Sequence, residues 1–154
     1  MLQAIDASGV DALIYASGIA DVLVRRYTNE RMTLSREIYD MGQALAEADG
    51  LLCHGSFGTV WEGLLAGVPM ICLPVHMEQL LATTALTNLG AAIQLGNDAT
   101  KEAIADAIRD LLRRPSYTQA AESIAQKYSD FDPAIQITEL VDASLSTIRG
   151  RLVG

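Results

Sequence analysis

Short apolar segments alternate five times with segments of helical periodicity, and this alternation constrains the fold more than any other feature of the chain. Such short, continuously apolar strands, separated by helices, are typical of a parallel sheet that is buried on both faces. We therefore predict an α/β fold, a Rossmann-like parallel sheet with helices on both faces. The expected strands span residues 11–16, 32–36, 50–53, 70–73 and 92–95.

The helices expected between these strands begin and end at residues that favour helix termini. Asp40 is placed to cap a helix over 41–48, while Gly67 and Gly90 are placed to stop helices over 58–66 and 77–89. Residues 2–8 form the end of a further helix. The helix over 19–27 has an apolar face that consists of Ile19, Val22, Leu23 and Tyr27.

Beyond residue 95 the pattern is helical only. Thr100 caps a helix that Pro115 ends, and a second helix runs over about 116–128. Asp132-Pro133 predicts the start of a third. The apolar face of the first consists of Ile104, Ala107, Ile108, Leu111 and Leu112, and that of the third of Ile137, Val141, Leu145 and Ile148.

Length and order of the elements predict a single domain over 1–154. The chain starts inside a helix, whereas a doubly wound domain normally starts with a central strand. We therefore expect a fragment, or a separately made half of a larger protein, that lacks its first strand. The sheet would then contain a gap with unpaired backbone groups, which we expect to close by re-pairing or by exchange with a second copy.

Composition excludes several classes of protein. The net charge of −8 argues against a nucleic-acid surface. The apolar runs are shorter than the roughly 20 residues of a membrane span, and no signal-peptide pattern is present, so we expect a cytoplasmic protein. Cys53 and Cys72 lie in apolar segments, which predicts buried free thiols rather than a disulfide or a metal site.

A phosphate site is predicted where the third strand ends. His54 follows this strand, and the turn into the next helix contains small and hydroxylic residues: Gly55, Ser56, Gly58 and Thr59. In open α/β sheets ligands bind at the carboxyl ends of strands, and free N–H groups at a helix start favour anions. On its own, however, such a Gly/Ser-rich turn is more commonly ordinary turn chemistry.

Three polar residues near the same edge are suited to sugar hydroxyls. Glu62 lies one turn into the helix after His54, where a carboxylate can accept hydrogen bonds from a ribose diol. Glu78 and Gln79 open the next helix and offer acceptors and donors for a donor sugar. The alternative readings are a solvated helix Glu at 62 and a dipole-favoured acid at 78.

The block from His54 to Gln79 resembles the donor-binding signature of glycosyltransferase family 1, the UDP-sugar-dependent enzymes with the GT-B fold. The residues that carry the resemblance are His54-Gly55-Ser56, Glu62, Ala66-Gly67-Val68-Pro69, Pro74 and Glu78-Gln79. The sequences LTNLGAAIQL and NDATKEAIADAIRDLLRRPSY resemble the family's continuation.

The resemblance implies a role for each matched residue. His54 would contact the donor phosphate, with Gly55, Ser56, Gly58 and Thr59 forming the diphosphate cradle. Glu62 would bind the ribose, and Glu78 and Gln79 the sugar, where several hexoses would fit. Ser56, Phe57 and Glu78 depart from the family's commoner residues. Ile38 and Tyr39 are the nearest candidates for the aromatic that stacks on uracil.

The resemblance covers only the donor half of a GT-B enzyme. It implies that no catalytic residue lies in this chain, because the base belongs to an N-terminal acceptor domain or a partner subunit. The implied substrate is a UDP-sugar, with no cofactor and no metal, and the chain alone would be inactive. Alternatives are a module that completes an acceptor subunit, a relative of nucleotide-sugar epimerases or of the cell-wall N-acetylglucosaminyl transferase, and a degenerate domain.

Overall fold

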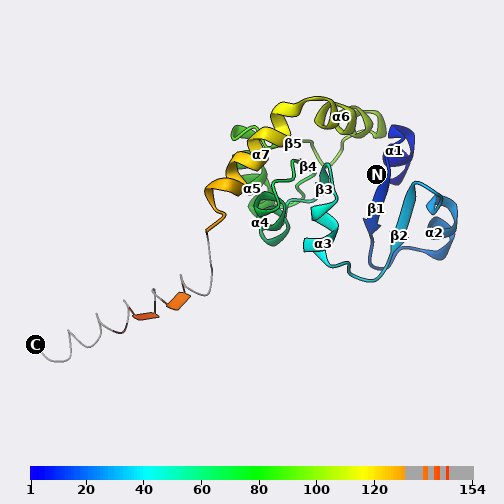
Figure 1. Cartoon of the computed structure of the whole chain (residues 1–154). Coiled ribbons are helices and arrows are strands. Elements are labelled where there is room, and N and C mark those ends of the chain that lie inside the picture. Colours follow the sequence, from blue (N-terminus) through cyan, green and yellow to red (C-terminus); the bar gives the residue numbers. More distant parts are fainter. Residues whose placement is uncertain (131–136, 139–140, 143–144, 146–154) are drawn as a thin grey trace, which may run out of the picture.

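The computed structural model describes residues 1–130, 137–138, 141–142 and 145, in which short strands alternate with helices (Figure 1). The strands are β1 (Ala12–Tyr15), β2 (Met32–Ser35), β3 (Leu51–Cys53), β4 (Met70–Cys72) and β5 (Ala92–Gln94). The helices are α1 (Leu2–Ser8), α2 (Asp21–Tyr27), α3 (Met41–Ala46), α4 (Phe57–Leu65), α5 (Met77–Asn88), α6 (Lys101–Arg113) and α7 (Pro115–Lys127).

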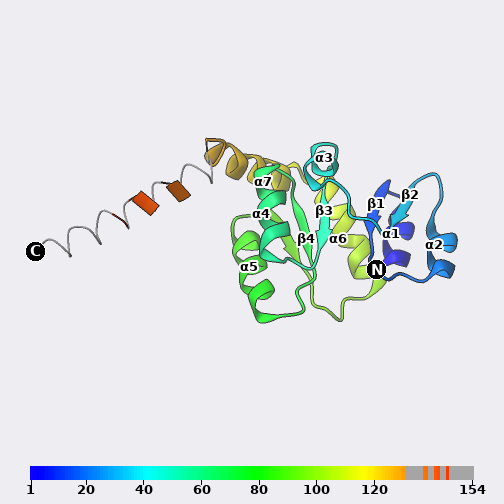
Figure 2. The same ribbon diagram turned by 90° about the horizontal axis from the view of Figure 1, so that it is seen from below.

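The strands form two parallel sheets. β1 pairs with β2, and β3, β4 and β5 pair in that order. Across Figures 1 and 2 the strands follow the order β2, β1, β3, β4, so that the edges of β1 and β3 are turned toward each other. The predicted α/β fold with parallel strands is confirmed, but the single sheet is divided between β1 and β3.

No ladder of hydrogen bonds joins β1 to β3 within the described residues. The prediction that the chain closes this gap by re-pairing its own strands is therefore wrong. Within each sheet consecutive strands pair, because short crossover connections of parallel strands favour adjacent pairing, whereas the consecutive strands β2 and β3 lie in different sheets. Exchange with a second copy stays a prediction.

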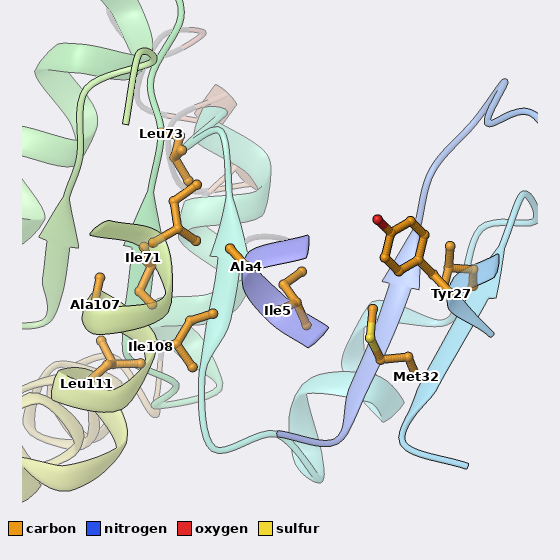
Figure 3. Packing of buried hydrophobic residues seen from close by; sticks show 11 residues of the cluster. Ala4, Ile5, Tyr27, Met32, Ile71, Leu73, Ala107, Ile108 and Leu111 are labelled. Atoms are coloured by element: carbon orange, nitrogen blue, oxygen red, sulfur yellow. The ribbon is translucent and has the colours of Figure 1, made fainter. Parts of the chain in front are cut away.

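β4 separates the core into two layers, because successive side chains of a strand point to opposite faces. Ile71 and Leu73 face the layer of α1 and α6, where Figure 3 shows them with Ala107, Ile108 and Leu111. Met70 and Cys72 face the layer of α4, α5 and α7. Both faces of β4 are therefore covered by helices, as the apolar sequence predicts.

β1 is covered on one face only. Ala12 and Ile14 pack against the cluster that includes α1 and α6, whereas Leu13 is 52% exposed and Tyr15 is 48% exposed. The second helix layer does not extend over these two side chains. The prediction that helices cover both faces of the sheet thus fails at this strand.

Some predicted helix boundaries and faces differ from the structure. α2 begins at Asp21 rather than at 19, because the Ile19 carbonyl accepts hydrogen bonds from Arg36, which also pairs with Asp21. Val22, Leu23 and Leu112 are exposed rather than in the core.

The predicted third helix falls largely outside the described residues. Ile137, Val141 and Leu145 are helical and exposed, and Asp132, Pro133 and Ile148 lie outside the described part. Within that part no helix is long and apolar enough to cross a bilayer.

Candidate functional site

The predicted site residues follow the ends of two neighbouring strands. β3 ends at Cys53 and β4 at Cys72, and these two residues are partners in the parallel register. The turns into α4 and α5 therefore leave the same edge of the sheet. The structure thus places the turn at His54 and the helix start at Glu78 on one edge.

At position 55 both the backbone conformation and the available space favour glycine over residues with a side chain. The φ of Gly55 is +82°, in the left-handed region that side chains disfavour. A Cβ built on it would lie 2.2 Å from the Cγ2 atom of Thr83. The turn after His54 therefore packs directly on α5.

Thr83 and Gln94 anchor this turn, and the sequence analysis missed both. Thr83 is fully buried, and its hydroxyl donates a hydrogen bond of 2.7 Å to the Oε1 atom of Gln94, which Thr84 also approaches at 3.2 Å. A buried hydroxyl needs such a partner. The sequence does contain a signal for this pair: a polar residue at the centre of a predicted helix, and Gln94 in a predicted buried strand.

The start of α4 lacks a side-chain cap. Ser56 is its N-cap residue, but the Ser56 hydroxyl bonds the Thr59 hydroxyl at 2.9 Å instead of a backbone N–H group. The first N–H groups of a helix have no partner inside it. Gly58 is exposed, and nothing lies within 4 Å of a Cβ built there. This helix start is open and favourable for an anion.

The ring of His54 is fixed by one backbone contact. Its Nδ1 atom lies 3.1 Å from the Leu73 carbonyl oxygen, which ties the turn after β3 to the end of β4. A carbonyl oxygen only accepts hydrogen bonds, so Nδ1 carries a hydrogen. Among the described residues the ring has no salt bridge, and Nε2 has no hydrogen-bond partner.

The three residues predicted to bind sugars are accessible on their helices. Glu62 and Glu78 are exposed, and Gln79 is half-buried. The Oε1 atom of Gln79 accepts a hydrogen bond of 2.8 Å from the N–H of Val75. This bond holds the turn before α5 and leaves the amide nitrogen of Gln79 to donate to a ligand.

The two residues considered for the nucleotide base precede α3. Ile38 is 81% exposed. The hydroxyl of Tyr39 is buried and has no hydrogen-bond partner in the part of the chain that the structure describes. Buried hydroxyls without a hydrogen-bond partner are rare, so Tyr39 is the unusual residue of this segment.

Cys53 and Cys72 are free thiols beneath the turn. A hydrogen bond from the Cys72 thiol lowers the pKa of Cys53 despite burial, and the backbone of Gly55 acts in the same direction. The same contact, together with burial, raises the pKa of Cys72. No cluster of three or more metal-ligating side chains occurs among the described residues.

A cavity of about 620 Å³ lies between α1, α2 and α6. Its lining contains none of the predicted site residues. Its charged residues are three basic and three acidic ones: Arg26, Lys101, Arg109, Asp6, Glu102 and Asp106. The sequence analysis did not single it out. Its basic residues are matched by acidic ones, so it offers no excess of charge toward an ionic ligand.

Residues 32–142 match the family model described as "Erythromycin biosynthesis protein CIII-like, C-terminal domain". The chain is 30% identical to the UDP-glucosyltransferase avaP of Aspergillus versicolor over 103 residues, which cover 66% of this chain and 23% of that protein. It is 35% identical to a PGL/p-HBAD biosynthesis glycosyltransferase of Mycobacterium tuberculosis over 86 residues, which cover 55% and 20%.

Solved structures share the fold. The calicheamicin glycosyltransferase CalG4 matches with a TM-score of 0.80 and 18% identity, over 96% of this chain and 40% of that one. The glycosyltransferase VinC, solved in complex with dTDP, matches with a TM-score of 0.76 and 23% identity, over 92% and 36%.

The chain spans less than half the length of each of these proteins. The family model nevertheless matches most of the chain, and its range includes every residue of the strand-end site from His54 to Gln79. The GT-B fold of the structural neighbours agrees with the parallel α/β architecture described above. The chain belongs to the family of erythromycin biosynthesis protein CIII-like C-terminal domains, which are domains of GT-B glycosyltransferases.

Proposed function

We propose that this chain is the donor-binding half of a glycosyltransferase that moves a hexose from a nucleotide diphosphate sugar to an acceptor hydroxyl. One observation carries the proposal. The start of α4 is uncapped and lies beside His54 at the sheet edge, because Gly55 packs against Thr83 and the Ser56 hydroxyl is directed to Thr59. A diphosphate is the ligand that suits such a helix start.

The remaining site residues take roles along the donor. Ser56, Gly58 and Thr59 surround the diphosphate, and Glu62 accepts hydrogen bonds from the ribose hydroxyls. Glu78 accepts hydrogen bonds from the sugar, and Gln79 donates to it through the nitrogen that Val75 leaves free. UDP-sugars are the donor class we propose, in line with the relatives' printed names.

The reaction needs a second set of residues outside this chain. A base in an acceptor domain or partner subunit would take the proton of the acceptor hydroxyl, which then attacks the anomeric carbon of the sugar. The departing nucleoside diphosphate would be stabilised by His54 and by the N–H groups at the start of α4. The chain alone would therefore bind the donor without transferring the sugar.

Calorimetric titration of the chain with UDP tests this proposal. We expect binding that weakens in Glu62→Ala, because the ribose loses its acceptor. Glu30→Ala is the matched control, since Glu30 is an exposed acid in the turn before β2. Equal binding by both variants would contradict the role of Glu62, and a folded chain that binds no UDP would contradict the proposal.

A second candidate function is supported by the exposed face of β1. Leu13 and Tyr15 form an uncovered apolar surface beside the unpaired edge of the strand, as expected for a module that completes another subunit. A chain that binds no UDP but elutes as a larger assembly in size-exclusion chromatography would favour this alternative.

A further inference from the structure

We infer that His54 holds the donor diphosphate as an imidazolium, so that donor binding takes up one proton per chain. The inference rests on the proposed function, and it concerns the charge state of the site rather than the identity of the donor. It follows from the contact that fixes the ring and from the charge of the ligand.

The Leu73 carbonyl selects the tautomer of the neutral ring. Because this oxygen accepts at 3.1 Å from Nδ1, the single hydrogen of a neutral His54 lies on Nδ1. Nε2 then carries a lone pair and can only accept. This is the nitrogen that has no partner among the described residues.

A sugar-nucleotide diphosphate offers nothing that such a nitrogen could accept. Its phosphate oxygens are ionised at neutral pH and carry no hydrogen. A lone pair on Nε2 would therefore repel them, whereas an imidazolium donates a charge-assisted hydrogen bond. In a neutral ring the single hydrogen is held on Nδ1, so Nε2 has none of its own to donate. The second proton must then arrive with the ligand.

The titratable groups around the site are consistent with a proton that binds together with the donor. The elements at this edge contribute the thiols Cys53 and Cys72, the carboxylates Glu62 and Glu78, and the second histidine, His76. Neither carboxylate forms an ion pair with His54 in the part of the chain described by the structure.

Calorimetry with UDP-glucose in two buffers of different ionisation enthalpy measures the proton directly. UDP-glucose is chosen because it lacks the terminal phosphate of UDP, which itself titrates near pH 6. At pH 7.5 we expect the buffer dependence to report about one proton taken up. Between pH 7.5 and 8.5 the affinity should fall about tenfold. Each donor that binds takes up one proton, and the proton concentration is about ten times lower at the higher pH.

Two variants separate His54 from the other groups. The chain has two histidines, so His76→Gln is the matched control for His54→Gln. In His54→Gln the amide can still donate to a phosphate but cannot ionise. We expect it to bind without proton uptake and with affinity that is independent of pH over this range. His76→Gln should keep the uptake and the pH dependence of the parent.

Each outcome decides the question. Binding by the parent without proton uptake overturns the inference and leaves the proposed donor site intact. Proton uptake that survives in His54→Gln also overturns it, because another group must then bind the proton. Absence of binding between pH 6 and 8.5 overturns both the inference and the proposed function.

Discussion

β4 and β1 have equally apolar sequences and opposite surroundings. The side chains from Met70 to Cys72 are almost fully buried between two helix layers, while in β1 every second side chain is about half exposed. Both strands are parallel to their neighbours and both contact the layer of α1 and α6. The difference is the second layer, which α4, α5 and α7 supply at β4 and which no described helix supplies over Leu13 and Tyr15.

This difference separates the molecule into a region that carries the site and a region that does not. The turns at His54 and Glu78 belong to strands that are covered on both faces, so their backbones are fixed by packing. The β1–β2 sheet depends on one layer and has an unpaired edge. We therefore expect substitutions in the covered region to lower the free energy of unfolding more than substitutions in the β1–β2 sheet. The experiments below test this expectation, from the largest expected effect to the smallest.

Removing a core side chain should have the largest effect. Met70→Ala deletes a side chain that is fully buried, and it should lower the free energy of unfolding by about 2–5 kcal/mol. Leu13→Ala should lower it by less than about 1 kcal/mol, because half of this side chain is already in water. Urea unfolding followed by circular dichroism measures both. Equal losses would mean that the outer face of β1 is covered in solution.

Glycines with positive φ provide the second comparison. Gly55→Ala combines a left-handed backbone with a contact at 2.2 Å to Thr83, so we expect a loss of about 2–4 kcal/mol in unfolding free energy. Gly18→Ala has a similar φ of +74° but nothing within 4 Å, so only the backbone cost of about 1–2 kcal/mol remains. Thermal unfolding of the two variants should differ accordingly. A Gly55→Ala chain as stable as Gly18→Ala would show that the turn is not packed on α5.

The buried hydroxyl beneath the turn should have a smaller effect. Thr83→Val keeps the shape of the side chain but removes the donor to Gln94, and we expect a loss of about 1–2 kcal/mol. Thr84→Val removes an exposed hydroxyl that bonds the same oxygen at 3.2 Å, and its effect should stay within about 0.5 kcal/mol. Chemical denaturation of the pair measures the difference. A larger loss of stability in Thr84→Val than in Thr83→Val would contradict the role given to Thr83.

The two thiols should differ in reactivity rather than in stability. Because the Cys72 thiol lowers the pKa of Cys53, Cys53 is ionised to a greater extent than Cys72 at any given pH and should be alkylated first by iodoacetamide at pH 8. Cys72→Ala removes the donor, so the pKa of Cys53 rises and its alkylation slows. Cys72→Ser keeps a donor and should slow it less. Mass spectrometry of the modified peptides reports the order, and equal rates in all three chains would contradict it.

Sequence patterns predicted the parts of the fold that depend on near neighbours. Asp40 and Thr100 cap their helices through hydrogen bonds from the Gln43 and Ala103 N–H groups, and Gly67 and Gly90 end helices with positive φ. These signals act over three or four residues, so the chain carries them locally. The positions of His54 and Glu78 just after neighbouring strands also agree with the structure, and they were predicted from the alternation of strands and helices.

The parts that the sequence did not reveal depend on distant segments. Leu13, Val22 and Leu112 have the same character as buried residues, and their exposure results from which layers cover them. The contact between Gly55 and Thr83 joins the turn before α4 to the middle of α5, and no local pattern encodes it. The roles of His54, Glu62 and Gln79 toward a ligand stay predictions.

The aromatic column beside the site gives the molecule an intrinsic optical reporter. The chain has one tryptophan, Trp61, which stacks on Phe57 at the first residue of α4 and meets the edge of Tyr128 just past α7. All emission excited at the red edge of tryptophan absorption therefore originates one turn from the uncapped helix start. A ligand that settles there would alter the quenching or the wavelength of this single emitter, without any attached dye.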